Sequence, residues 1–137
     1  MFSLHCQPCL PSYERNTDGI NIMVFYFVVH TLLGLIAASS AQIVTGAKHS
    51  VASYPLWVQN SVWASGGAFC SMICAFLAIP TTFFSWGLTY TFYTIGEIIL
   101  GLVIAGLMPQ PIKILMLIIG PIVSIVIMGA LWGFWYI

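Results

Sequence analysis

Long runs of apolar residues, separated by short polar or proline-containing segments, dominate the hydropathy pattern of this chain. Four of these runs are near the roughly 20 residues that a helix needs to cross the hydrocarbon core of a bilayer. The pattern therefore predicts an all-α integral membrane fold, an antiparallel bundle of four transmembrane helices with no soluble domain. The predicted helices cover 22–44, 56–79, 83–108 and 112–137, and a polar N-terminal tail covers 1–21.

The breaks between the later helices are very short. Pro80-Thr81-Thr82 is expected to form one turn, with a threonine hydroxyl capping the next helix, and Pro109-Gln110-Pro111 is expected to form another. Short connections join antiparallel neighbours, so the last three helices should pack side by side within the domain 22–137.

Composition agrees with the membrane class. Of 137 residues, 61% are hydrophobic and only 4% are charged, which leaves too few charges for the surface of a soluble domain. The formal net charge is zero, so no basic surface for nucleic acid is expected. Membrane lipid is the expected surrounding of the chain.

An even number of spans places both termini on the same side of a membrane, which the sequence does not identify. The count of Lys and Arg in short segments decides orientation. Lys48 and Lys113 lie on the side of the connections and Arg15 lies on the side of the termini. This two-to-one count favours termini on the non-cytoplasmic side.

Small residues recur four positions apart along three of the predicted helices. Such spacing lets helix backbones approach closely where apolar burial does not drive association. The residues can pack the bundle itself, or one of the stripes can dock onto another subunit. They are Gly34, Ala38, Gly67, Ser71, Ala75, Gly101 and Ala105.

Glu97 is the least expected residue, because it lies near the middle of an apolar run. Acids at membrane depth are costly and are functional hypotheses by default. Tyr93 and Tyr90 precede it by four and seven positions, on the same predicted interior face. His30 is the natural partner, offset by roughly 5–7 Å along the membrane normal at about 1.5 Å per residue. The pair is either a hydrogen-bonded link between helices or a proton or cation site.

Cysteines form a second candidate group. Cys6 and Cys9 have C-x-x-C spacing, which suits a disulfide, free or acylated thiols, or a redox pair. His5 would add a third metal ligand, but no fourth ligand follows, so no metal site is expected. Cys70 and Cys74 are expected to behave as small buried hydrophobes.

No catalytic motif or carboxylate pair is present, so neither enzymatic activity nor a cofactor is predicted. The leading hypothesis is a non-catalytic accessory subunit of a larger integral-membrane complex, with other membrane subunits as partners. The alternative is a small proton- or cation-coupled transporter or channel component that uses Glu97 with His30. A thiol–disulfide enzyme using Cys6 and Cys9 is a third, weaker hypothesis.

Overall fold

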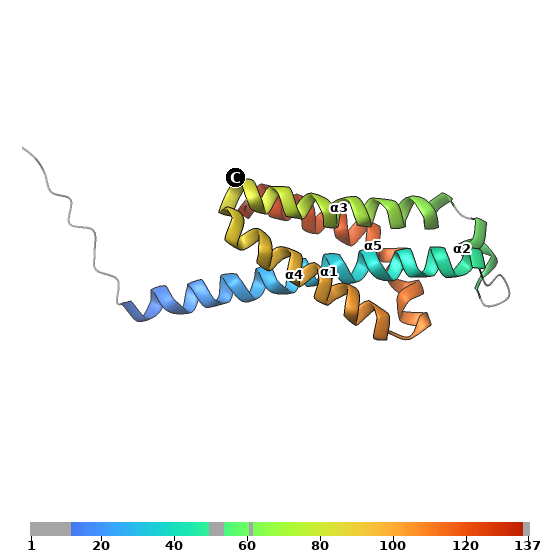
Figure 1. Ribbon diagram of the computed structural model, residues 1–137, viewed down its shortest axis with the longest axis horizontal. Coiled ribbons are helices and arrows are strands. Elements are labelled where there is room, and N and C mark those ends of the chain that lie inside the picture. Colours follow the sequence, from blue (N-terminus) through green and yellow to red (C-terminus); the bar gives the residue numbers. More distant parts are fainter. Residues whose placement is uncertain (1–11, 50–53, 61, 136–137) are drawn as a thin grey trace, which may run out of the picture.

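The computed structural model describes residues 12–49, 54–60 and 62–135, and the regular elements in these segments are all helical. Four of these helices are long and apolar enough to cross a membrane, which confirms the all-helical class with four apolar spans. The elements in chain order (Figure 1) are α1 (Ser12–His49), α2 (Leu56–Asn60), α3 (Val62–Trp86), α4 (Leu88–Leu107), α5 (Gln110–Ala130) and a final π-helical turn, η2 (Leu131–Trp135).

Helix α1 is the central element of the bundle. It packs against α3, α4 and α5, and α3 also packs against α4 and α5. Among its fully buried side chains are Leu33, Ile36 and Ile43. Two apolar clusters result, one around Leu33 and Leu131 and the other around Ile43 and Leu117.

The start of α1 differs from the prediction. Residues 12–21, expected in the polar tail, are the first turns of α1. At about 1.5 Å per residue, 38 helical residues extend about 57 Å, well beyond the roughly 30 Å of a bilayer core. The apolar part of α1 is Asn21–Ala47, which matches the predicted first span much more closely.

The predicted turn at Pro80 is wrong, because α3 continues through it to Trp86. The hydroxyls of Thr81 and Thr82 donate to the carbonyls of Leu77 and Ala78, both at 2.7 Å, inside the same helix. The threonines therefore support α3 and do not cap the next helix. In apolar surroundings, such side-chain hydrogen bonds to nearby carbonyls help a helix to tolerate an interior proline.

Gly87 makes the turn instead. Its φ of 85° and ψ of −178° belong to a backbone region that is essentially restricted to glycine. Helix α4 consequently starts at Leu88, and the predicted start at residue 83 was too early.

The predicted packing of the last two helices is also wrong. The break around Pro109 is confirmed, since α4 ends at Leu107 and α5 starts at Gln110. However, α4 and α5 scarcely contact each other, because both pack against α1. Figure 1 shows α4 crossing α1 obliquely and diverging from α5.

Two glycines allow the backbones of α1 and α4 to touch. A Cβ atom on Gly34 would lie 2.8 Å from Cα of Ile98 and would meet its carbonyl oxygen. A Cβ atom on Gly101 would lie 2.6 Å from the backbone nitrogen of Leu35 and would meet the carbonyl of Thr31. Backbone atoms cannot move aside as a flexible side chain can, so this crossing requires glycine on both helices.

The other predicted packing residues are also used within the chain. A Cβ atom on Gly67 of α3 would lie 2.7 Å from Cγ of Pro121 in α5. The buried set also contains Ser71, Ala75 and Ala105, and Ala38 is half-buried. These residues thus pack helices of the bundle against one another.

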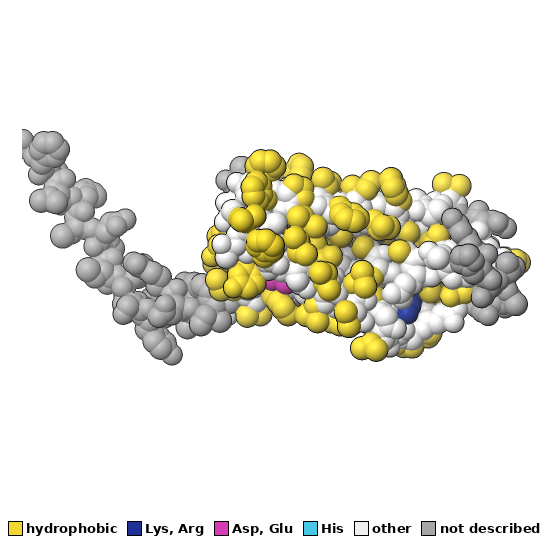
Figure 2. Space-filling view, in the orientation of Figure 1, with side chains coloured by type: hydrophobic (Ala, Val, Ile, Leu, Met, Phe, Trp, Pro, Cys, Tyr) yellow, Lys and Arg dark blue, Asp and Glu magenta, His cyan; other side chains and the backbone are white. Residues whose placement is uncertain are grey.

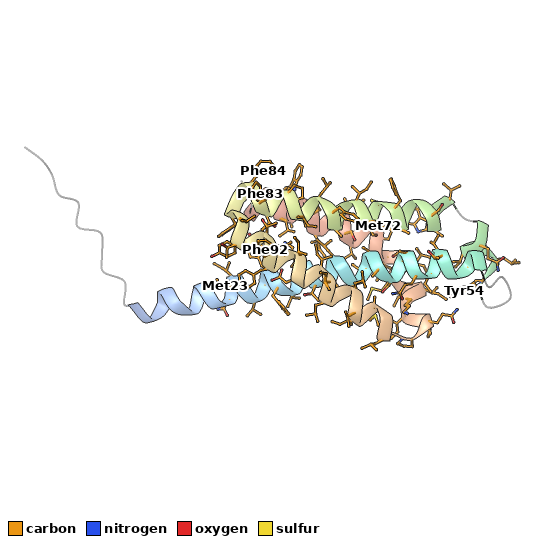
Figure 3. The ribbon with its side chains drawn as sticks, viewed as in Figure 1. Met23, Tyr54, Met72, Phe83, Phe84 and Phe92 are labelled. Atoms are coloured by element: carbon orange, nitrogen blue, oxygen red, sulfur yellow. The ribbon has the colours of Figure 1, made fainter. Side chains whose placement is uncertain are left out.

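The outer surface of the described chain is strongly apolar. Figure 2 shows hydrophobic side chains over most of the visible face, with one acidic and one basic spot. Large side chains such as Phe84 and Phe92 are exposed (Figure 3). The basic group of Lys113 donates to Oε1 of Gln42 at 2.8 Å and joins α5 to α1.

We predict that Gly101→Ala lowers the unfolding free energy by about 1–3 kcal/mol, because the added methyl group would clash with the backbone of α1. Denaturant titration in mild detergent, followed by helical circular dichroism, measures the change. The matched control is Gly96→Ala on the same helix, where nothing lies within 4 Å of the new Cβ. Equal losses in both variants would contradict the close crossing.

Candidate functional site

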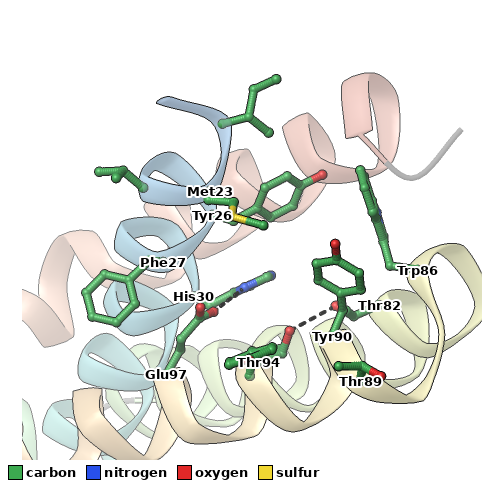
Figure 4. Close-up of a pocket in the computed structure, with 13 residues that line it drawn as sticks. Met23, Tyr26, Phe27, His30, Thr82, Trp86, Thr89, Tyr90, Thr94 and Glu97 are labelled. Carbon is green, nitrogen blue, oxygen red and sulfur yellow. Dashed lines mark hydrogen bonds and ion pairs between the residues drawn. The ribbon is translucent and has the colours of Figure 1, made fainter. Parts of the chain in front are cut away.

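His30 and Glu97 meet between α1 and α4. Nδ1 of His30 and Oε2 of Glu97 are 2.8 Å apart and share a hydrogen bond (Figure 4). The His30 side chain is only 2% exposed, whereas Glu97 retains 15%. A neutral acid with a neutral imidazole and a carboxylate with an imidazolium carry the same net charge of zero. A proton shared across this hydrogen bond can therefore lie on either partner without a net charge in the interior.

The helix crossing explains why these side chains meet. His30 lies one helical turn before Gly34, and Glu97 lies one turn before Gly101. Residues four apart share a helix face, and helical side chains lean toward the N-terminus. Contact between the backbones at the two glycines therefore brings the side chains one turn earlier within hydrogen-bonding distance.

An open pocket lies beside the pair. Its volume is about 990 Å³, and α1, the end of α3 and the start of α4 form its walls. Figure 4 shows His30 and Glu97 on one side of this space and the rings of Tyr90 and Trp86 on the other. The lining residues are Ile22, Met23, Val24, Tyr26, Phe27, His30, Thr82, Trp86, Thr89, Tyr90, Tyr93, Thr94 and Glu97.

Aromatic rings form a continuous wall. The ring centroids of Tyr26 and Trp86 are 5.8 Å apart, and those of Trp86 and Tyr90 are 5.6 Å apart. Tyr26 also lies 5.6 Å from the His30 ring. The wall connects the aromatic end of the bundle with the polar pair.

Helices α3 and α4 are joined at the pocket by a second polar contact. The Thr94 hydroxyl donates to the Thr82 hydroxyl at 3.3 Å, and both side chains are buried. The Thr82 hydroxyl in turn donates to the carbonyl of Ala78. This contact fixes the end of α3 against α4 beside Glu97.

The two predicted tyrosines lie at the pocket and not in the interior. Tyr90 is 41% exposed and Tyr93 is 65% exposed. The buried face of α4 runs through Thr94 and Gly101, so both tyrosines lie at its edge. In the part of the chain that the structure describes, neither hydroxyl hydrogen-bonds to Glu97.

Sequence reasoning did not single out several members of the site. Neither Tyr26 nor Trp86 was among the candidates, and Thr82 was placed in a turn. The position of Tyr26, four residues before His30, was a usable signal because it puts both rings on one face of α1. Trp86 and Thr82 had no such signal, because the end of α3 was misplaced.

The cysteine predictions have different outcomes. Cys6 and Cys9 lie outside the described residues. Cys70 and Cys74 are free thiols on α3, and Cys74 is buried. The described residues contain no group of three or more His, Cys, Asp or Glu side chains that could hold a metal ion.

Comparisons with known proteins give no assignment. No family model, curated protein or solved structure matches this chain. The functional argument therefore rests on the pocket and the pair of ionisable side chains inside it.

We predict that Glu97→Leu lowers the unfolding free energy by about 1–3 kcal/mol, because buried Nδ1 of His30 loses this hydrogen bond. Glu97→Gln should cost clearly less, since its amide can still hydrogen-bond to the imidazole. Unfolding of the two variants in the same detergent measures the difference. Equal losses would show that the contact contributes little to α1–α4 packing.

Proposed function

We propose that this chain is an integral membrane protein that crosses a bilayer four times as an antiparallel helix bundle, with both termini on one side. Four apolar helices and an exposed surface rich in large hydrophobic side chains support this proposal. The counts of Lys and Arg favour termini on the non-cytoplasmic side, because Lys48 and Lys113 oppose Arg15.

In this membrane protein, the pocket at Glu97 is the proton- or cation-binding site of a small transport component. A single observation carries the proposal: Glu97, hydrogen-bonded to the buried His30, lines an open pocket and keeps part of its side chain exposed there. An acid at membrane depth is costly, and such residues typically mark ion or substrate pathways. A pair that only joined two helices would need no adjoining space.

The chemistry proposed for the site is the exchange of one proton for one cation. The pair is neutral while it holds its one proton. A cation that approaches Glu97 favours the carboxylate, so the proton leaves and the total charge of the occupied site stays unchanged. Conserving charge in this way limits the cost of desolvation, which dominates the energetics of ions in apolar surroundings.

The transport function is placed first here, whereas the sequence alone favoured the accessory subunit. The small-residue stripes are the reason for this change. The accessory-subunit hypothesis relied partly on those stripes as docking surfaces. Gly34, Gly67 and Gly101 instead contact other helices of the same chain.

We predict that Glu97→Gln abolishes coupled proton and cation flux in proteoliposomes, because the amide cannot release a proton. Flux is measured with a pH-sensitive dye trapped inside the vesicles, after an inward cation gradient is imposed. Gln42→Leu, a substitution at the Lys113 contact outside the pocket, serves as the control and should retain most of the flux. Unchanged flux in Glu97→Gln would reject a transport role for the acid.

The second candidate function is the non-catalytic accessory subunit of a larger membrane complex. A different set of glycines supports it: Gly66, Gly96, Gly106 and Gly129 have open space where a side chain would lie. Glycines on an outer helix surface would allow a helix of another subunit to approach closely.

For this candidate we expect the protein, extracted from its native membrane in mild detergent, to run in size analysis as part of an assembly much larger than one 15.0 kDa chain with its micelle. Substitution of Gly96 by Leu should shift it toward smaller species, because the bulky side chain blocks helix approach. A stable lone monomer in the native extract would exclude the accessory-subunit role.

A further inference from the structure

The pocket lining contains a permanent acid but no permanent base. Glu97 is its only acidic member, and neither Lys nor Arg is in the lining. The Lys113 ammonium lies outside the lining, where it contacts Gln42. An anionic guest would therefore meet no fixed cation except a protonated His30, whereas a cationic guest would meet a carboxylate.

The aromatic wall also favours a cationic ligand over an anionic one. Tyr26, Trp86 and Tyr90 form a chain of rings, each within 6 Å of the next. The faces of aromatic rings are electron-rich and attract amines and quaternary ammonium groups. A carboxylate beside such rings is a recognised combination for binding organic cations.

The volume and the apolar lining of the pocket indicate what the rest of the ligand is like. A volume of about 990 Å³ is at the upper end of the range for small-molecule sites, roughly 300–1,000 Å³. Ile22, Met23 and Phe27 line the pocket beyond the polar pair. These side chains suit an apolar body and give a hydrated metal ion nothing to bind.

We propose that the pocket binds an amphiphilic organic cation, with its positively charged head between Glu97 and the aromatic wall and its apolar body along α1. This inference names the ligand class of the site proposed above and rests on that proposal. Occupation releases the one proton that His30 and Glu97 share: the proton leaves for solvent, Glu97 remains as a carboxylate beside a neutral His30, and the guest supplies the compensating charge.

The surroundings of Glu97 are compatible with this proton balance. From α1 the groups that face it are His30 and Tyr26, and from α4 they are Tyr90 and Tyr93. Helix α3 adds Thr82 and Trp86, which do not titrate in the usual pH range. Among the residues that line the pocket, His30 and Glu97 are thus the two that share a hydrogen bond between ionisable groups.

The test uses two ions of similar shape and opposite charge, tetraphenylphosphonium and tetraphenylborate. Titration calorimetry of the purified full chain in detergent should show saturable binding of the phosphonium, at least about tenfold tighter than that of the borate after subtraction of empty micelles. Titrations in buffers of different ionisation enthalpy should show one proton released per phosphonium bound. Equal affinity for the two ions would overturn the proposal.

Variants give a second, independent readout. Glu97→Gln should weaken phosphonium binding by at least about tenfold and remove the proton release. Trp86→Leu should weaken binding by about threefold to tenfold, whereas Trp63→Leu, at the opposite end of α3 and outside the pocket, should leave it unchanged. Wild-type affinity and proton release in folded Glu97→Gln would also overturn the proposal.

The natural guest can be a free amphiphile or the choline group of a lipid. Nanodiscs of equal surface charge, made of phosphatidylglycerol mixed with either phosphatidylcholine or a neutral glycolipid, separate these sources: weaker phosphonium binding with the choline lipid identifies a lipid guest, and equal binding identifies a free cation. The two proposals also fail separately. Cation-selective binding without flux rejects transport alone, and Glu97-dependent proton flux without phosphonium selectivity rejects this ligand class alone.

Discussion

The close contact between the backbones of α1 and α4 is the constraint on which the site depends. Gly34 lies against Ile98, and Gly101 lies against Leu35, so neither helix can withdraw without losing this contact. One turn before the crossing, the same geometry holds His30 against Glu97. The polar pair is thus positioned by glycine packing, and its hydrogen bond adds to a contact that the backbone already makes.

The pocket is formed by the way the other helices pack around this crossing. Helix α4 lies obliquely on α1 and separates from α5, as Figure 1 shows. The extension of α3 to Trp86 then brings an aromatic ring and Thr82 to the edge of the space. An aromatic wall beside a neutral pair that holds one proton is the physical basis for the proposed cation exchange.

Local sequence signals predicted the number of helices better than their ends. The break at Pro109 was correctly predicted, whereas Pro80 was taken for a turn although α3 passes through it. An interior proline removes one backbone donor, and a helix can continue through it where other groups satisfy the nearby backbone. Here threonine hydroxyls bond to the carbonyls of α3, and Gly87 supplies a backbone conformation that other residues avoid.

The sequence by itself determined the four apolar spans, the small residues that pack them, and the two residues whose polarity is out of place, His30 and Glu97. These features depend on composition and on the spacing of residues along one helix, and both can be taken directly from the sequence. Only the tertiary structure decided that α4 packs on α1 instead of α5, and that Tyr90 lies in a pocket wall. Both depend on the angle at which two helices distant in sequence cross. This angle arises from the contact between their glycine faces, and the spacing of residues along either helix does not encode it.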